Sequence, residues 1–206
     1  MSARTADALA PAPLSELLDR GCPHDEIRSW LDSLSRADRV QAALALRGSR
    51  VGRLYRAVAG GAPVYAEDFV AASTPDDTTV IMEGRNSLPA FSRFQKRFAR
   101  LGETIVGYNH QSMSMVTGPG YFEVVRGAED DAAEESRRGL YFDYTRVPSH
   151  APTGWPPVRP NTSGLSRLVY AHMTDTMRSV ADGVVVGAAY KRGVAQNAFF
   201  VLCHAD

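Results

Sequence analysis

TIVGYNHQSMSMVTGPGYFEVVR, residues 104–126, is the longest segment of the chain that follows one regular pattern. Near its middle, Gly118-Pro119-Gly120 predicts a chain reversal, because proline fixes φ at about −65° and glycine accepts the positive φ of tight turns. The residues before the turn alternate between two faces, and those after it are mostly aromatic or β-branched, which is typical of paired strands. We therefore expect an antiparallel β-hairpin.

The first strand of this hairpin is rich in polar side chains. Tyrosine, asparagine, histidine and glutamine occupy the four consecutive positions 108–111. Such a strand either buries polar groups that hydrogen-bond one another or presents them to a ligand. Strand alternation places Asn109, Gln111, Met113 and Met115 on one face, and Tyr108, His110, Ser112 and Ser114 on the other.

Composition restricts the classes of protein to which this chain can belong. Its 206 residues are enough for one well-buried core, and 44% hydrophobic with 22% charged residues is ordinary for globular domains. Basic and acidic residues balance at 23 each, so no overall field attracts nucleic acid or an anionic membrane. We expect a cytoplasmic protein, because the sequence lacks both a transmembrane segment and a signal-peptide core. Cys22 and Cys203 are then expected to stay reduced.

The first quarter of the sequence predicts a group of short helices. Residues 1–12 have no periodicity and are expected to form a disordered arm. Proline and glycine then separate four amphipathic segments, 14–19, 24–34, 36–47 and 51–59, with Ser35 as the N-cap of the third. Because each helix is too short to be stable alone, we expect residues 13–61 to form a helical subdomain docked on the main core of residues 62–206.

The main core is predicted to belong to the α+β class. In 88–100 and again in 164–181, apolar residues repeat every three or four positions, so both segments are predicted to be helices. The segments between them are predicted to be strands, most of them connected as hairpins. The expected architecture is a curved antiparallel sheet of about six strands, with the long C-terminal-half helix packed on it and the N-terminal group of short helices beside it.

Two further segments carry specific predictions. Every residue from Ala198 to Cys203 is apolar, so we expect both faces of the last strand to be covered. Residues 147–161 hold five of the twelve prolines and Trp155. This composition excludes a helix or a central strand and predicts an ordered loop with an aromatic anchor.

His110 is the first candidate for chemistry. Imidazole titrates near neutral pH, and the small neighbouring serines leave room for a substrate. In a catalytic role, Tyr108, Asn109 or Asp143 would orient the ring or stabilise an oxyanion. The competing interpretation is a half-exposed strand histidine that hydrogen-bonds a neighbour, and Asp143 is equally explained as the polar member of an alternating strand.

A pocket for a small molecule is expected close to the hairpin. Methionines adapt to irregular ligands, although they also fill irregular cores. His172 falls within the apolar stripe of the predicted helix 164–181, where it is either a hydrogen-bonded core residue or a ligand contact. The residues expected to bind the ligand are Gln111, Met113, Met115, Tyr144, Trp155 and His172.

No sequence motif indicates a metal, a cofactor or an activated nucleophile. No histidine or cysteine pair has metal-site spacing, no glycine-rich loop opens a helix, and no GxSxG occurs. We therefore expect no metal and no cofactor. The basic flank of segment 88–100 fits a membrane-surface helix, but a solvated face is the simpler interpretation, so membrane contact is not expected.

The sequence is compatible with three functions. The first is a soluble domain that binds a small apolar or mixed-polarity molecule near the hairpin 104–126. The second is a cofactor-independent enzyme of the isomerase, cyclase or hydrolase type, with His110 as general acid or base. The third is a scaffold or assembly partner that uses the N-terminal helices. Nucleic acid is not an expected partner, and a homo-oligomer is left open.

Overall fold

The computed structural model describes residues 13–88, 92–110, 118–128 and 134–205. In these residues four short helices come first: α1 (Leu14–Asp19), α2 (His24–Ser33), α3 (Arg36–Ala45) and α4 (Ser49–Ala57). Single helical turns follow later in the chain as η1 (Ala66–Asp68), η2 (Glu135–Arg137) and α6 (Ser166–Val169). No helix of this described part is both long enough and apolar enough to cross a membrane.

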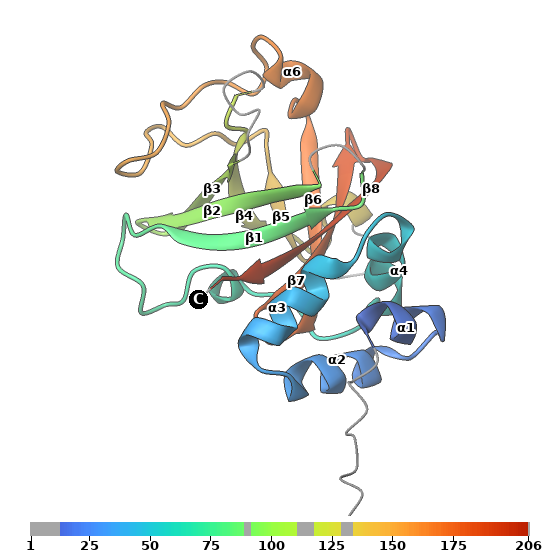
Figure 1. Cartoon of the computed structure of the whole chain (residues 1–206). Helices are drawn as coiled ribbons and strands as arrows, with labels where there is room; N and C mark the ends of the chain where they lie inside the picture. The colour runs from blue at the N-terminus through green and yellow to red at the C-terminus, as the bar shows by residue number, and fades with distance from the viewer. Residues whose placement is uncertain (1–12, 89–91, 111–117, 129–133, 206) are drawn as a thin grey trace, which may run out of the picture.

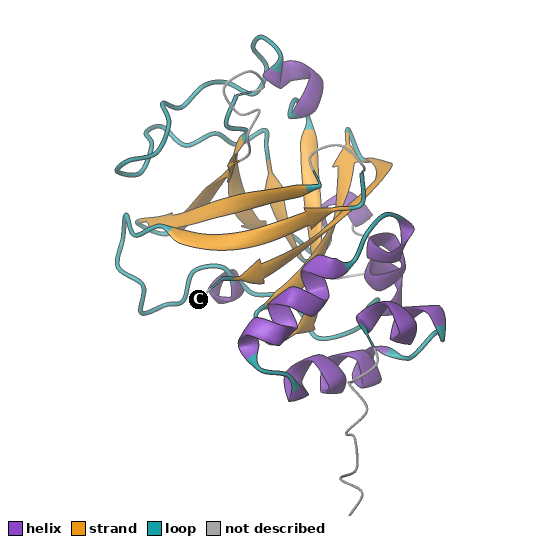
Figure 2. Cartoon of the chain, viewed as in Figure 1, coloured by secondary structure: helices purple, strands orange, loops and turns teal. Residues whose placement is uncertain are grey.

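The strands of the described chain form a closed antiparallel barrel (Figures 1 and 2). Each strand pairs with the next one along the chain, and β1 also pairs with β8, so the sheet has no free edge. The strands are β1 (Val80–Asn86), β2 (Arg93–Leu101), β3 (Thr104–His110), β4 (Tyr121–Arg126), β5 (Leu140–Asp143), β6 (Met173–Ala181), β7 (Val184–Lys191) and β8 (Val194–His204).

Aromatic side chains fill much of the barrel interior. Successive residues of a strand point to opposite faces, so every second side chain faces inward. The ring of Phe98 lies 5.6 Å from that of Phe122 and 5.5 Å from that of Phe142. An eight-stranded barrel is just wide enough to be filled by side chains or to hold one small ligand.

The two ends of the barrel are different. At one end, the chain around η1 plugs the opening, and the Phe69 ring lies 5.1 Å from the rings of both Phe98 and Phe142. The other end is made by the described parts of the connections that follow β1, β3, β5 and β7, because neighbouring strands run in opposite directions. The longest of these connections contains α6 (Figure 1). The barrel is therefore closed at the η1 end and open at the other end.

Glycines let aromatic rings lie across the neighbouring strands. Gly84, Gly107 and Gly187 pair with Phe94, Phe122 and Phe200 respectively. A Cβ atom at Gly187 would lie 2.3 Å from Cζ of Phe200, so any larger residue there must displace the ring. Glycine at such positions lets a barrel strand bend over a bulky interior.

Helices α2, α3 and α4 pack on the outer face of the barrel beside β6, β7 and β8, and α1 packs against α4 (Figure 1). Their apolar residues form a second core outside the barrel, in which Ile27, Leu31 and Leu54 meet Val186 and Val201. The four helices agree closely with the predicted segments. The predicted N-cap is also confirmed, because the backbone N–H of Asp38 donates to Oγ of Ser35.

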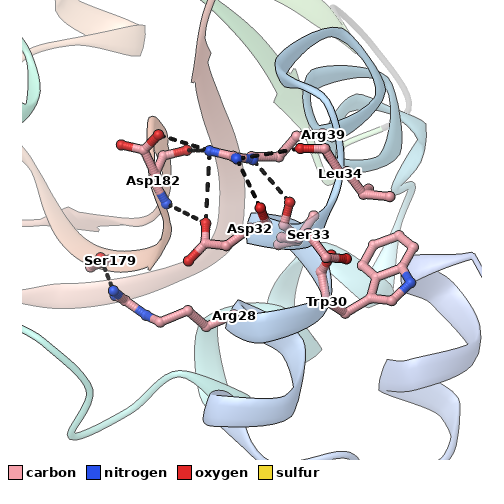
Figure 3. A network of polar contacts seen from close by, with 9 residues as sticks. Arg28, Trp30, Asp32, Ser33, Leu34, Arg39, Ser179 and Asp182 are labelled. Carbon is pink, nitrogen blue, oxygen red and sulfur yellow. Dashed lines mark hydrogen bonds and ion pairs between the residues drawn. The ribbon is translucent and has the colours of Figure 1, made fainter.

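Arg39 of α3 connects the helices to the turn between β6 and β7 (Figure 3). Its Nη1 donates to the backbone carbonyl of Asp182 at 2.7 Å and to Oδ2 of Asp182 at 2.9 Å, while Nε donates to the carbonyl of Leu31 at 2.9 Å. The Asp182 N–H in turn donates to Oδ1 of Asp32 at 3.0 Å. Because the Arg39 side chain is only 11% exposed, these bonds stabilise more than a surface ion pair does.

The predicted α+β class is wrong, because both long segments predicted to be helices contain strands. Segment 88–100 contains all of β2 except its last residue, Leu101. Phe94 and Phe98 are four residues apart, a spacing that fits one helix face but also fits alternate inward positions of a strand. The basic residues do not share a flank, since Lys96 is buried inside the barrel while Arg93 is exposed.

The predicted long helix 164–181 is also wrong. It contains α6 and then β6, and His172 between them is exposed with a φ of 59°. Asp175 and Met177 face the barrel interior, while Thr174 and Thr176 are buried on the outer side. Because both faces of β6 are covered, its sequence lacks the alternation of buried and exposed residues that identifies a strand.

The hairpin and the last strand have the predicted pairing. β3 and β4 are antiparallel, with Tyr108 opposite Tyr121, whereas Ser112 lies outside the described residues, as do residues 1–12. β8 lies between β7 and β1. Phe200, Val201 and Leu202 are buried and Phe199 is partly buried, so both faces of this strand are covered as expected. The boundary between residues 13–61 and 62–206 stays a prediction.

Candidate functional site

The open end of the barrel leads into a cavity of about 420 Å³. This volume lies within the range of small-molecule pockets. Phe94 and Phe200 contribute aromatic walls, and apolar side chains of the α6 region, Leu168 and Val169, lie at the mouth. The cavity is therefore largely apolar, with a small number of polar groups among its lining residues.

Four inward-facing polar residues form one cluster in this cavity: Lys96, Asn109, Tyr144 and Asp175. Nζ of Lys96 donates to Oη of Tyr144 at 2.6 Å, to Oδ1 of Asn109 at 2.8 Å and to Oδ2 of Asp175 at 3.2 Å. Oη of Tyr144 also donates to Oδ2 of Asp175 at 2.9 Å. All three donor directions of the lysine amine are used, and its charge is balanced by one carboxylate.

Aromatic rings surround the Lys96 amine, whose side chain is only 2% exposed. Nζ lies 4.7 Å from the ring centroid of Phe122, 5.0 Å from that of Phe200 and 5.2 Å from that of Phe142. Burial lowers the pKa of Lys96, because the ammonium loses its hydration, and the negative charge of Asp175 opposes part of this effect. Burial, with a smaller contribution from Asp175, raises the pKa of the Tyr144 hydroxyl well above its ordinary value. The hydroxyl is therefore a proton donor at neutral pH.

Strand register brings the cluster together. Lys96 of β2 and Asn109 of β3 are directly opposite each other, and Asp175 of β6 is opposite Phe142 of β5. Tyr144 follows two residues after Phe142 and so faces the same side of the sheet. Asn161 fixes the backbone there, because its Nδ2 donates to the carbonyls of Tyr121 and Tyr144 at 2.7 and 2.8 Å.

Two of the residues predicted for the site, Asn109 and Tyr144, line the cavity. Tyr108 and Trp155 instead meet outside the barrel, with ring centroids 4.7 Å apart. Nε1 of Trp155 donates to Oγ1 of Thr79 at 2.7 Å. Trp155 is thus the aromatic anchor that the sequence predicts for the proline-rich loop, but it holds that loop against the outer wall and does not line this cavity.

His110, Asp143 and His172 do not line this cavity either. His110 is exposed on the outer face, and burial of part of its ring together with Arg97 lowers its pKa. Asp143 is buried but faces outward, where its Oδ1 accepts hydrogen bonds from the backbone N–H and hydroxyl of Thr145. These three residues therefore lie away from this cavity, and their predicted roles stay predictions. Gln111, Met113 and Met115 lie outside the described residues.

Sequence reasoning missed Lys96 and Asp175, the charged pair of the cavity. It placed Lys96 on the solvated flank of a helix and took Asp175 as part of another helix. One signal was present in the sequence: Lys96 and Lys191 are the only lysines among 23 basic residues. Both of them line this cavity.

Neither a metal site nor a relative identifies the function. Within the described ranges, no three side chains of histidine, cysteine, aspartate or glutamate are grouped closely enough to hold a metal ion. No family model, no curated protein and no solved structure matches the chain. The cavity itself is the feature of the structure that bears on function.

Proposed function

We propose that the protein binds one small, largely apolar molecule in the barrel cavity. The observation that carries this proposal is a cavity of about 420 Å³ whose mostly apolar lining surrounds one buried polar cluster. Small-molecule sites usually combine an apolar wall with a few placed polar groups that fix the orientation of the ligand. A fold whose interior is wide enough for one ligand is compatible with this function.

Exposed apolar side chains at the mouth support an apolar ligand. Among the described residues, three of the large apolar side chains left exposed line the cavity: Leu88, Leu168 and Val169. Such a cluster at the rim of a cavity marks a contact surface. It gives an apolar molecule a favourable path from solvent or a carrier into the barrel.

The polar cluster limits the chemistry of the bound end of the ligand. Lys96 and Asp175 balance each other's charge, so the cluster is polar but carries no net charge. A carboxylate placed against this cluster would add a buried charge that the cluster does not balance, and the other cation of the cavity, Lys191, is only partly buried and already donates to the carbonyl of Leu168. A neutral polar group, such as a carbonyl or hydroxyl, can exchange hydrogen bonds with the cluster without this penalty.

The neutral apolar dye N-phenyl-1-naphthylamine provides a direct test by fluorescence titration. We expect saturable binding of one dye per chain. Ala189→Trp places a large ring in the cavity wall and should weaken dye binding by about tenfold or more. Ala71→Trp, at an exposed position away from the cavity lining, is the matched control and should leave binding unchanged, as should His110→Ala.

The titration distinguishes binding in the cavity from binding to the outer surface of the protein. Saturable binding that only Ala189→Trp weakens supports the proposal. Dye fluorescence that does not saturate, or that responds equally to Ala189→Trp and Ala71→Trp, contradicts it. Loss of dye binding in His110→Ala would indicate that the dye binds at the outer face of β3 and not in the cavity.

A further inference from the structure

Both lysines of the chain are placed in one cavity. Of the 23 basic residues, all but Lys96 and Lys191 are arginine. Arginine supplies surface charge as well as lysine does, but the lysine amine can lose its proton and act as a nucleophile, whereas the guanidinium stays charged. Confinement of lysine to the cavity therefore indicates that amine chemistry, and not only positive charge, is used there.

Lys96 has the surroundings of a reactive amine. Its Nζ lies among aromatic rings, 2% of its side chain is exposed, and it still lines the cavity that opens at the barrel mouth. Desolvation in an apolar site favours the neutral, nucleophilic form of lysine. Lys191 differs, since it is only partly buried and its Nζ donates to the backbone carbonyl of Leu168 at 2.9 Å.

A proton donor and a proton acceptor are within hydrogen-bonding distance of the Lys96 amine. Oη of Tyr144 is 2.6 Å from Nζ and 2.9 Å from Oδ2 of Asp175, and Nζ is 3.2 Å from the same carboxylate oxygen. This triangle lets a proton pass directly between amine, hydroxyl and carboxylate. Formation and loss of water at a carbonyl carbon require this kind of proton transfer.

The geometry points to a covalent role for Lys96: its amine forms a Schiff base with an aldehyde or ketone group of the ligand. This inference rests on the proposed function and names the chemical class of the bound molecule. It also agrees with the balanced charges of Lys96 and Asp175, since this pair favours a neutral carbonyl over a carboxylate.

The reaction balances with the groups present and with no oxidant or reductant. The Lys96 amine first gives one proton to solvent, and its lone pair then attacks the carbonyl carbon to form a C–N bond while the carbonyl π electrons move to oxygen. The nitrogen passes a proton, through Asp175, to that oxygen, which gives a carbinolamine. A second proton, donated by Tyr144, lets the C–O bond break and water leave. The resulting iminium stays paired with Asp175, whose charge it balances, and Tyr144 regains its proton from solvent.

Reductive trapping of the intact protein tests this inference. The folded chain is incubated with octanal and sodium cyanoborohydride, which converts an iminium into a stable secondary amine. Intact mass and peptide mapping then locate the adduct. We expect one adduct at Lys96, formed about tenfold or more faster than any adduct at Lys191 or the amino terminus. Lys96→Arg should lose the adduct, and Ala189→Trp should slow it while Ala71→Trp does not.

A purely structural ion pair between Lys96 and Asp175 predicts the opposite labelling. In that case Lys96 is protected in the folded protein, and only Lys191 and the amino terminus react. This result overturns the inference. The wild-type protein alone is enough to observe it, so the test does not depend on whether Lys96→Arg folds. If N-phenyl-1-naphthylamine binds as proposed and Lys96 stays unmodified, the covalent inference fails while the proposed function stands. If the dye does not bind, the proposed function itself fails.

Discussion

Asp175→Asn removes the charge that balances Lys96 while keeping the size and shape of the side chain. Breaking a buried ion pair from one side generally costs about 3–5 kcal/mol, because the remaining charge is left unbalanced. The variant can avoid part of this cost by releasing the lysine proton. The ordinary lysine pKa of about 10.4 lies roughly 3.4 pH units above pH 7, and each unit corresponds to about 1.4 kcal/mol. Because the variant can always fold with Lys96 neutral, the free energy lost from the unbalanced charge is at most roughly 4.6 kcal/mol at pH 7.

The protonation state of Lys96 sets the direction of the pH dependence. A folded state that holds Lys96 neutral binds fewer protons than the unfolded chain, so its stability rises with pH until the unfolded lysine also loses its proton. At pH 9 the maximum loss of unfolding free energy falls to roughly 1.9 kcal/mol. We therefore expect Asp175→Asn to lower the unfolding free energy by about 3 to 4.6 kcal/mol at pH 7 and by about 2 kcal/mol or less at pH 9. The raised pKa of Tyr144 lowers stability only as the pH passes the ordinary tyrosine value of about 10, so it does not disturb this range.

Urea unfolding at both pH values measures these differences. Glu135→Gln is the control, because Glu135 pairs with Arg178 at 3.4 Å but its side chain is 56% exposed. It should change the unfolding free energy by less than about 1 kcal/mol, with no strong pH dependence. If Asp175→Asn costs no more than this control at pH 7, or costs the same at pH 7 and pH 9, then Asp175 does not balance a buried ammonium and the electrostatic reasoning is refuted.

Three further variants test the elements that shape and support the cavity. Gly187→Val should lower the unfolding free energy by about 2 kcal/mol or more, because its Cβ would lie 2.3 Å from the Phe200 ring; an unchanged urea midpoint would contradict this packing. Trp155→Ala should cost about 2–3 kcal/mol by removing the ring contact with Tyr108, and Trp155→Phe should recover much of the loss; equal losses in both would point away from the ring contact as the source of the stability. Arg39→Met should cost about 3 kcal/mol, since it leaves the carbonyls of Leu31 and Asp182 without their donor, and a loss below about 1 kcal/mol in thermal or urea unfolding would show that water replaces these bonds.

Local chemistry made several parts of this protein predictable from sequence. The four N-terminal helices were found because proline, glycine and Ser35 mark helix ends through backbone geometry that depends only on neighbouring residues. The β3–β4 hairpin was found for the same reason, from the turn residues at 118–120 and the strand pattern around them. The last strand was predicted to be covered on both faces because its run of apolar residues leaves no side for water.

Only the tertiary structure decided that the sheet closes into a barrel. β1 and β8 pair although they lie at opposite ends of the strand region, and no local pattern specifies a partner so distant in sequence. Closure also covers both faces of β6 and buries aromatic and charged residues together inside β2, so the usual alternation of polar and apolar positions disappears from these strands. The candidate site depends on this closure. Asn109 and Tyr144 were identified by their polarity within strands, but Lys96 and Asp175 acquire their roles only because strand register brings β2 and β6 to face each other across one narrow interior.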